Sequence, residues 1–209
     1  LAQQLEKDSS AFVRATIVKS LAKAGGDKHV ASILKALDDE DDRVRANVFE
    51  ALASAGANKQ TVAFALRHFA DPSSRVRKNA RTHFSSADEQ VKKEALEHML
   101  EEEHNDFRLA ALRYFKRQAE ESGSILVIEQ DRLVELVAPL REAMNQDVRF
   151  NAFALLKLLA KGGNDKAAEI LKTSQGGEDK WDSEEGPPPT FVTESQGNIG
   201  PESRRGRLY

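Results

Sequence analysis

The sequence contains no cysteine, which excludes a disulfide framework and thiolate chemistry and favours the cytoplasm as the location of the protein. No apolar run approaches the ~20 residues that a membrane-spanning helix requires, so we expect no membrane span. The chain also lacks a positive net charge, since its formal charge at pH 7 is −3. This balance argues against indiscriminate binding to nucleic acid.

Charged and hydrophobic residues are both abundant: 31% of the 209 residues are charged and 40% are hydrophobic. The chain is organised around the stretch from Asp38 to Leu52, which reads as an acidic turn, a Val-Arg pair and apolar residues at helical spacing. Val44, Val48 and Leu52 fall on one face of an amphipathic helix. The acidic run suits the N-terminal end of that helix, where carboxylates cap free N–H groups and oppose the helix dipole.

This stretch is repeated along the chain. The pair recurs at Val13-Arg14, Val44-Arg45, Val76-Arg77, Phe107-Arg108 and Val148-Arg149, at spacings of 31, 32, 31 and 41 residues. An acid stands five positions before the first four pairs, at Asp8, Asp39, Asp71 and Glu102, and Ala143 takes this place in the fifth. An asparagine stands three positions after the apolar residue at Asn47, Asn79 and Asn151. So many aligned positions indicate a repeat architecture.

The Asp…Val-Arg pattern resembles a HEAT repeat, in the short form of about 31 residues found in phycobilin-lyase-type HEAT proteins. The resemblance covers residues 1–172 and implies that each repeat is a pair of antiparallel helices, the second starting at the Val-Arg pair. It also implies a ladder between neighbouring repeats. The ladder would join the arginines Arg14, Arg45, Arg77, Arg108 and Arg149 to the acids Asp8, Asp39, Asp71 and Glu102.

We therefore predict an all-α chain: an α-solenoid of about five HEAT-like hairpins over residues 1–172, followed by an extended tail over residues 173–209. The longest spacing places about ten extra residues at 120–130, including the aliphatic run 125–128. We interpret this insertion as an enlarged loop whose apolar run packs against the flanking helices. The alternative is a projecting loop that contacts a partner.

The tail differs from the array in composition. It combines an acidic cluster at 178–185, three consecutive prolines at 187–189 and isolated aromatic residues, and it cannot continue a helical pattern. Trp181 and Phe191 are candidate anchors for docking onto an array, either that of the same chain or that of a neighbour.

No set of residues indicates catalysis, a cofactor or a metal centre. The five histidines are scattered among different repeats. Glu97, Glu101 and His104 would share a helix face only if the helix continued past Leu100. No glycine-rich phosphate loop and no converging nucleophile and base are present. We therefore expect a protein that is not an enzyme.

Binding is the remaining class of function. In HEAT-type solenoids the second helix of each repeat lines the concave face, and positions 2, 5, 6 and 9 after the valine should point away from the core. The candidate partner-binding residues are Val18, Phe49, Lys78, Arg81, Leu109, Leu112, Arg113, Lys116, Phe150 and Phe153. They predict a groove that is apolar toward both ends and basic in the middle. The alternative for the residues at position 5 is burial against neighbouring repeats.

The preferred hypothesis is a non-enzymatic scaffold that binds a partner peptide or helix on the concave face. The alternative is a nucleic-acid-binding module that uses the basic middle of that face, as some HEAT-like DNA glycosylases do. The acidic turns and the acidic tail argue against this alternative. The asparagines three positions after the valine should bond to a neighbouring repeat, because an amide inside a helix is costly unless it is paired.

Overall fold

The computed structural model describes residues 1–122 and 127–173, and Leu1–Thr173 form one compact unit. The predicted tail anchors Trp181 and Phe191 lie outside the described residues. Among the described helices, none is long and apolar enough to span a membrane. The elements are α1 (Ala2–Lys7), α2 (Ala11–Lys23), α3 (Gly26–Lys35), η1 (Ala36–Asp38), α4 (Asp42–Ala55), α5 (Lys59–Arg67), η2 (His68–Ala70), α6 (Ser74–Ser86), α7 (Glu89–Glu101), α8 (Asn105–Ser122), α9 (Gln130–Val137), η3 (Ala138–Glu142), α10 (Gln146–Lys161) and α11 (Asp165–Lys172).

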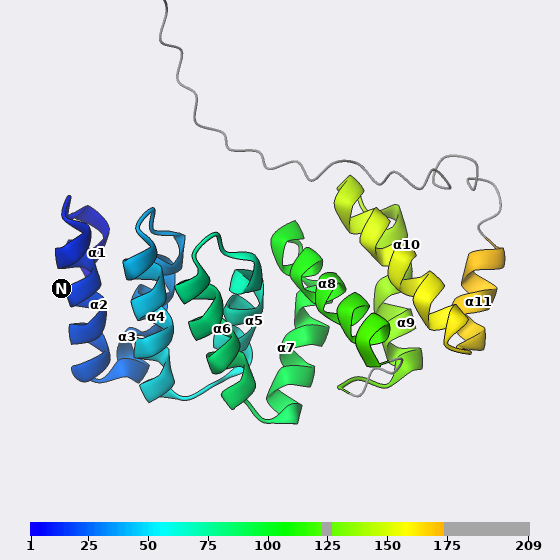
Figure 1. The fold of residues 1–209 in the computed structure, drawn as a ribbon, viewed down its shortest axis with the longest axis horizontal. Helices are drawn as coiled ribbons and strands as arrows, with labels where there is room; N and C mark the ends of the chain where they lie inside the picture. Colours follow the sequence, from blue (N-terminus) through cyan, green and yellow to red (C-terminus); the bar gives the residue numbers. More distant parts are fainter. Residues whose placement is uncertain (123–126, 174–209) are drawn as a thin grey trace, which may run out of the picture. The chain divides into compact units, whose positions relative to one another are not determined.

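The helices of this unit alternate between two rows, as expected for an α-solenoid (Figure 1). One row holds the helices that start at a repeated pair, here called the Val-Arg helices: α2, α4, α6, α8 and α10. The other row holds their companion helices, α1, α3, α5, α7 and α9, and α11 follows the last pair. The prediction of an all-α solenoid of about five helical hairpins is therefore confirmed.

Local capping explains where several helices begin. The Asp41 carboxylate accepts a hydrogen bond from the backbone N–H of Arg43 at the start of α4, as the acidic run predicted. Asn145 caps α10 in the same way, through the N–H of Val148. Side-chain caps thus begin the Val-Arg helices α4 and α10, whereas Ser10 and Ser73 form no such bond at the starts of α2 and α6.

The predicted ladder is present between the first three repeats. The Arg14 guanidinium donates to both carboxylate oxygens of Asp39, at 2.7 and 2.8 Å, and Arg45 donates to both of Asp71, at 2.9 and 3.0 Å. Each arginine thus bonds to the acid of the following repeat, and its third nitrogen bonds to carbonyls of its own turn. These two-point ion pairs fix the register of neighbouring hairpins.

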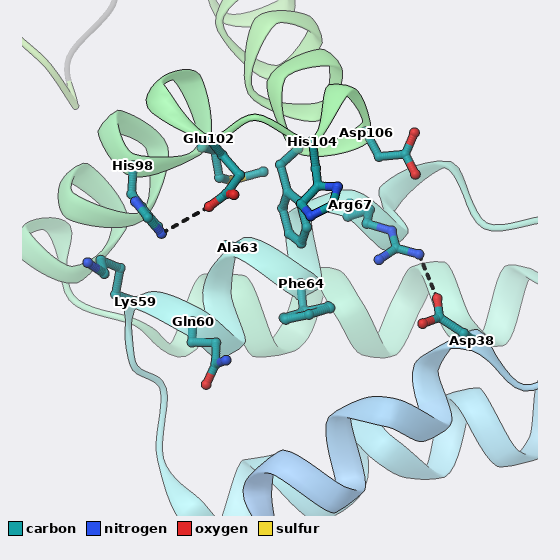
Figure 2. Close-up of a pocket in the computed structure, with 12 residues that line it drawn as sticks. Asp38, Lys59, Gln60, Ala63, Phe64, Arg67, His98, Glu102, His104 and Asp106 are labelled. Carbon is teal, nitrogen blue, oxygen red and sulfur yellow. Dashed lines mark hydrogen bonds and ion pairs between the residues drawn. The ribbon is translucent and has the colours of Figure 1, made fainter. Parts of the chain in front are cut away.

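The ladder is interrupted after the third repeat. Arg77 donates to the carbonyls of Asp71 and Pro72, and no carboxylate among the described residues pairs with it. Glu102, the acid expected to receive it, lies 3.4 Å from His98 instead (Figure 2). The ladder predicted from the resemblance is therefore wrong for Arg77 and Glu102, because the glutamate side chain turns back along its own helix. It is also wrong for Arg108 and Arg149, neither of which forms an ion pair with a carboxylate in the described ranges; Arg149 bonds to the carbonyls of Ala143 and Met144.

The asparagine row is confirmed at two of its three positions. Asn47 donates to the Ala15 carbonyl of the preceding Val-Arg helix, and Asn79 donates to that of Ala46. Asn151 donates to Asp147 within its own helix instead, so the expectation of a bond between repeats is wrong there.

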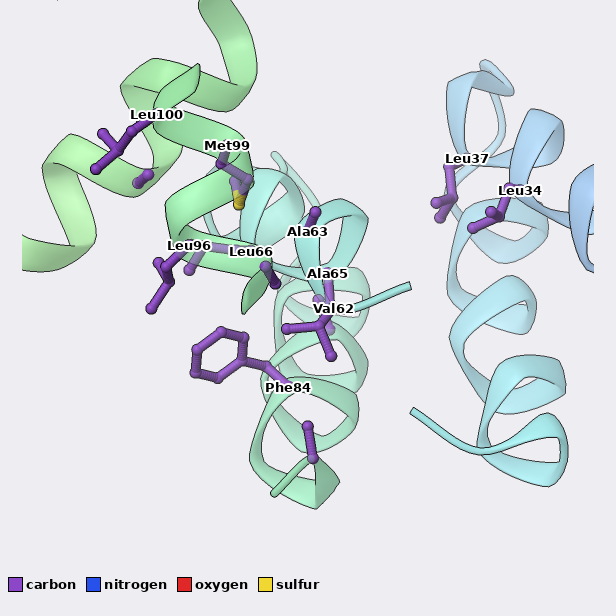
Figure 3. Close-up of a cluster of buried hydrophobic side chains, with 14 of the residues drawn as sticks. Leu34, Leu37, Val62, Ala63, Ala65, Leu66, Phe84, Leu96, Met99 and Leu100 are labelled. Carbon is purple, nitrogen blue, oxygen red and sulfur yellow. The ribbon is translucent and has the colours of Figure 1, made fainter. Parts of the chain in front are cut away.

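The hydrophobic core runs along the seam between the two rows (Figure 3). Val44 and Leu52 of the organising stretch are fully buried, and Val62, Leu66 and Leu96 of the companion helices are buried as well. The face predicted to be apolar is therefore the face that packs.

In the insertion at 120–130, the described part of the aliphatic run packs against the core, as the interpretation of a packed loop predicts. Ile128 is buried and Val127 is half-buried against the core, while residues 123–126 lie outside the described ranges.

The ladder predicts how stability depends on pH. Burial by itself raises the pKa of Asp39 and of Asp71. Hydrogen bonds from the arginines and from backbone amides lower each pKa by more than burial raises it, so both pKa values lie below the ordinary 3.8. The resulting stabilisation is present above pH 3.8 and is lost as the pH falls through the folded-state pKa values. Urea unfolding between pH 7 and pH 2 should show this loss.

The Asp39→Asn/Asp71→Asn double variant is the control, since it removes both titrating groups. Its free energy of unfolding should fall less steeply over the same acid range. Equal slopes for the two proteins would show that the ladder carboxylates do not control acid stability.

Candidate peptide-binding groove

The row of Val-Arg helices is interrupted at the place where the ladder ends. Helices α2, α4 and α6 pack side by side, and so do α8 and α10, whereas α6 and α8 approach each other closely at few points. Across the interruption α8 packs against α5, and Phe84 of α6 meets Tyr114 of α8 with ring centroids 5.3 Å apart. Figure 1 shows α8 and α10 tilted away from the direction of the first three Val-Arg helices. The row therefore opens between the third and fourth repeats.

A groove of about 430 Å³ lies along α8 at this opening, and we call it the α8 groove. Its first wall consists of Leu66, Arg67, Phe69 and Ala70, from α5 and η2. Its second wall is one face of α8 and consists of Asp106, Leu109, Ala110, Arg113, Tyr114, Arg117, Gln118 and Glu121. The combination of apolar and aromatic side chains with a few charged groups is typical of a binding site.

The α8 groove carries arginines that no carboxylate in the described part of the chain pairs with. Arg113 and Arg117 line it one turn apart, and the Arg81 guanidinium of α6 lies 5.6 Å from the centre of the Phe69 ring in the opposite wall. Among residues 1–122 and 127–173, no carboxylate forms an ion pair with any of these three arginines. Arg67 differs, since it bonds to Asp38 at 2.6 Å. An anionic group in the groove would therefore find guanidinium groups free to bind it.

One cation of α2 and another of α6 show the opposite situation. Glu50 of α4 accepts from Arg75 at 2.8 Å and from Asn79 at 3.2 Å, and the ammonium group of Lys19 lies 3.8 Å away. Lys19 and Arg75 are thus paired with Glu50. Arg81, Arg113 and Arg117 differ from them, because they form no ion pair within the described residues.

Seven of the ten predicted partner-binding residues reach the surface. Lys78, Arg81 and Arg113 are exposed, and Leu109, Lys116, Phe150 and Phe153 are half-buried. Only Leu109 and Arg113 line the α8 groove itself. Lys116 lies 6.0 Å from the ring of Phe150, on the side of α8 that faces α10.

The expected exposure of Val18, Phe49 and Leu112 is wrong. All three are buried, with at most 2% of their area accessible. They stand five positions after the apolar residue of the pair, on the flank of the Val-Arg helix that neighbouring elements cover. Phe49, for example, packs edge-on against the His68 ring, with centroids 5.6 Å apart. The alternative considered from the sequence, burial by neighbouring repeats, is the correct one at these positions.

Several residues of the α8 groove could not be recognised in the sequence. Phe69 lies in the short 3₁₀ segment η2 that ends a companion helix, and Arg67 and Arg117 fall outside the positions that the repeat pattern selects. One related signal is present in the sequence. Alanine stands at residue 110, the repeat position at which Asn47 and Asn79 bond to the preceding Val-Arg helix.

A second pocket, of about 590 Å³, lies on the other side of Arg67 and is shown in Figure 2. Phe64 and Phe107 meet edge-on in its wall, with centroids 5.2 Å apart, and His98 and His104 also line it. In the described part of the chain, no three acidic or histidine side chains are placed to hold a metal ion. The face that would join Glu97, Glu101 and His104 does not form, because α7 ends at Glu101.

Comparison with known proteins gives one family match. Residues 1–83 match the family model described as HEAT repeats. Among curated proteins there is no match. Similar solved structures include an engineered protein, 16% identical, with a TM-score of 0.38, over 85% of this chain and 89% of that one. Another is a designed armadillo repeat protein, 20% identical, with a TM-score of 0.37, over 86% of this chain and 92% of that one.

These two structures are too distant to bear on function. The family match covers the part of the chain where the ladder is intact, which comprises the first two repeats and most of the third. The resemblance inferred from the Asp…Val-Arg pattern is thus confirmed: residues 1–83 match HEAT repeats, and the helical hairpins that follow extend the same two-row array to Lys172.

Proposed function

We propose that this protein is a protein-interaction scaffold that binds an acidic peptide or helix of a partner in the α8 groove. The observation that carries the proposal is the opening of the helix row beside arginines that have no carboxylate partner among the described residues: Arg113 and Arg117 line the apolar groove, and Arg81 lies against Phe69 in its wall. Leu109, Tyr114 and Phe69 would bury apolar side chains of the ligand. The arginines would bind its carboxylates by charge-assisted hydrogen bonds.

Protein ligands fit the groove better than nucleic acid does. Asp106 and Glu121 line the two ends of the same groove, and a continuous polyanion would meet both carboxylates. A peptide can place acids beside the arginines and other residues at the ends. The acidic segment 178–192 of the chain, with Trp181 and Phe191, stays a predicted ligand of this kind on its sequence alone.

Selection from a random peptide library displayed on phage, with the full chain as target, tests the proposal. The enriched peptides should be acidic and contain an aromatic or large aliphatic residue. Arg113→Glu should weaken binding of a synthetic enriched peptide at least about tenfold, which corresponds to ~1.4 kcal/mol. Fluorescence anisotropy measures the dissociation constants.

Lys28→Glu is the matched control, because it makes the same change of charge at an exposed residue of α3, far along the array from α8. It should leave the affinity within about twofold. The proposal is wrong if no acidic peptide is enriched, or if both variants weaken binding equally. Binding of a random-sequence DNA duplex that falls steeply with salt, without peptide binding, would favour the nucleic-acid alternative.

A further inference from the structure

The wall that α8 contributes to the groove is a continuous helical stripe. Its residues, from Asp106 to Glu121, follow one another at alternating intervals of three and one. Such spacing keeps every side chain on one face of the helix. At 1.5 Å per residue the stripe is about 22 Å long, which is the length of a helix of some fifteen residues. The ligand therefore meets a long, straight surface rather than a compact pocket.

Elsewhere in the array a helix covers the corresponding face. Asn47 of α4 bonds to the backbone of α2, and Asn79 of α6 bonds to that of α4. The same repeat position on α8 is Ala110, which lines the groove. The α8 stripe is thus the face on which a Val-Arg helix normally receives its neighbour, and here that neighbour is displaced.

The charges along the stripe follow a definite order. Asp106 lies in the first turn of α8, Arg113 and Arg117 follow in the middle, and Glu121 lies in the last turn. Between them Leu109, Ala110 and the half-buried ring of Tyr114 form the apolar floor. A complementary helix would carry acids in its middle and basic residues toward both ends, with apolar residues along one face.

We infer that the α8 groove receives an amphipathic α-helix of a partner, with the charge order basic, acidic, basic, in the place that a neighbouring Val-Arg helix occupies elsewhere in the array. This inference rests on the proposed function and specifies the class of partner. The order is symmetric, so it holds for either direction of the bound helix. An extended acidic peptide satisfies the proposed function but not this inference.

Three synthetic 18-residue peptides test the inference against the full chain by fluorescence anisotropy. The first has apolar residues at helical spacing, central glutamates and lysines at both ends. The second has the same composition with the charges exchanged, so that lysines are central and glutamates lie at the ends. The third is the first peptide with one central residue replaced by proline, which breaks a helix.

The first peptide should bind at least tenfold more tightly than either of the others. The Arg113→Glu/Arg117→Glu variant should lose this preference, and Lys28→Glu should keep it. Circular dichroism and thermal melting of each variant check that the array remains folded.

The results separate the inference from the function on which it rests. Equal binding of the first and third peptides, with sensitivity to Arg113→Glu, leaves the scaffold proposal in place and overturns the helical partner. Equal binding of the first and second peptides overturns the charge order. If no peptide binds and the library selection also yields none, both proposals fail.

Discussion

Replacing Phe49 with alanine is expected to lower the free energy of unfolding by about 3–5 kcal/mol. The ring is 2% exposed and packs against the rings of His68 and His83. Its removal leaves a cavity in α4 at the centre of the regular part of the array. Urea denaturation of the full chain, followed by circular dichroism at 222 nm, measures the loss.

Phe12→Ala is the matched control. This side chain belongs to α2 and is 74% exposed, so its truncation should change the stability by no more than about 0.5 kcal/mol. The same pair of variants also decides the role of Phe49. If Phe49→Ala kept full stability but abolished binding of the library peptides, Phe49 would be a contact residue for the partner. The prediction that Phe49 stabilises the core would then be wrong.

The second large effect is expected at the ladder. Replacing Arg45 with alanine should cost about 3 kcal/mol, because it leaves the Asp71 carboxylate largely buried without its two-point partner. A double-mutant cycle with Asp71→Ala should give a coupling free energy of more than about 1 kcal/mol. The readout is again the free energy of unfolding in urea.

Arg77 provides a close comparison within the same chain. Like Arg45, it donates through Nη1 to two carbonyls of its own turn, but it has no carboxylate partner among the described residues. The cycle of Arg77→Ala with Glu102→Ala should therefore give a coupling near zero. Similar coupling energies for the two pairs would mean that the ladder is continuous in solution, which would contradict the interruption on which the α8 groove depends.

The repeat pattern was sufficient to predict the helices and the order in which they pack. Val44, Val48 and Leu52 recur at helical spacing, and a helix with such a stripe must bury it. The ladder was implied by the resemblance to HEAT repeats, and it is present where Arg14 meets Asp39 and Arg45 meets Asp71.

The candidate site was predictable only in part. The repeat positions of Arg81 and Arg113 predict that they point away from the core of their own hairpin, and both are exposed. The same rule predicts exposure of Phe49 and Leu112, which are buried. Helical periodicity gives the direction of a side chain around its own axis, but it contains no information about how far a neighbouring helix extends around that axis.

By itself, the sequence determined the all-α repeat, the paired helices and the acidic cap of α4, and the resemblance that it carries implied the first ladder bonds. Each of these depends on residues within one hairpin or on fixed positions in two adjacent copies. Only the tertiary structure decided that α8 packs against α5, that Glu102 turns toward His98 and that a groove opens beside Arg113. The physical reason is that the angle between two hairpins results from many small packing contacts at once. A change at a single position, such as alanine in place of asparagine at residue 110, does not reveal that angle.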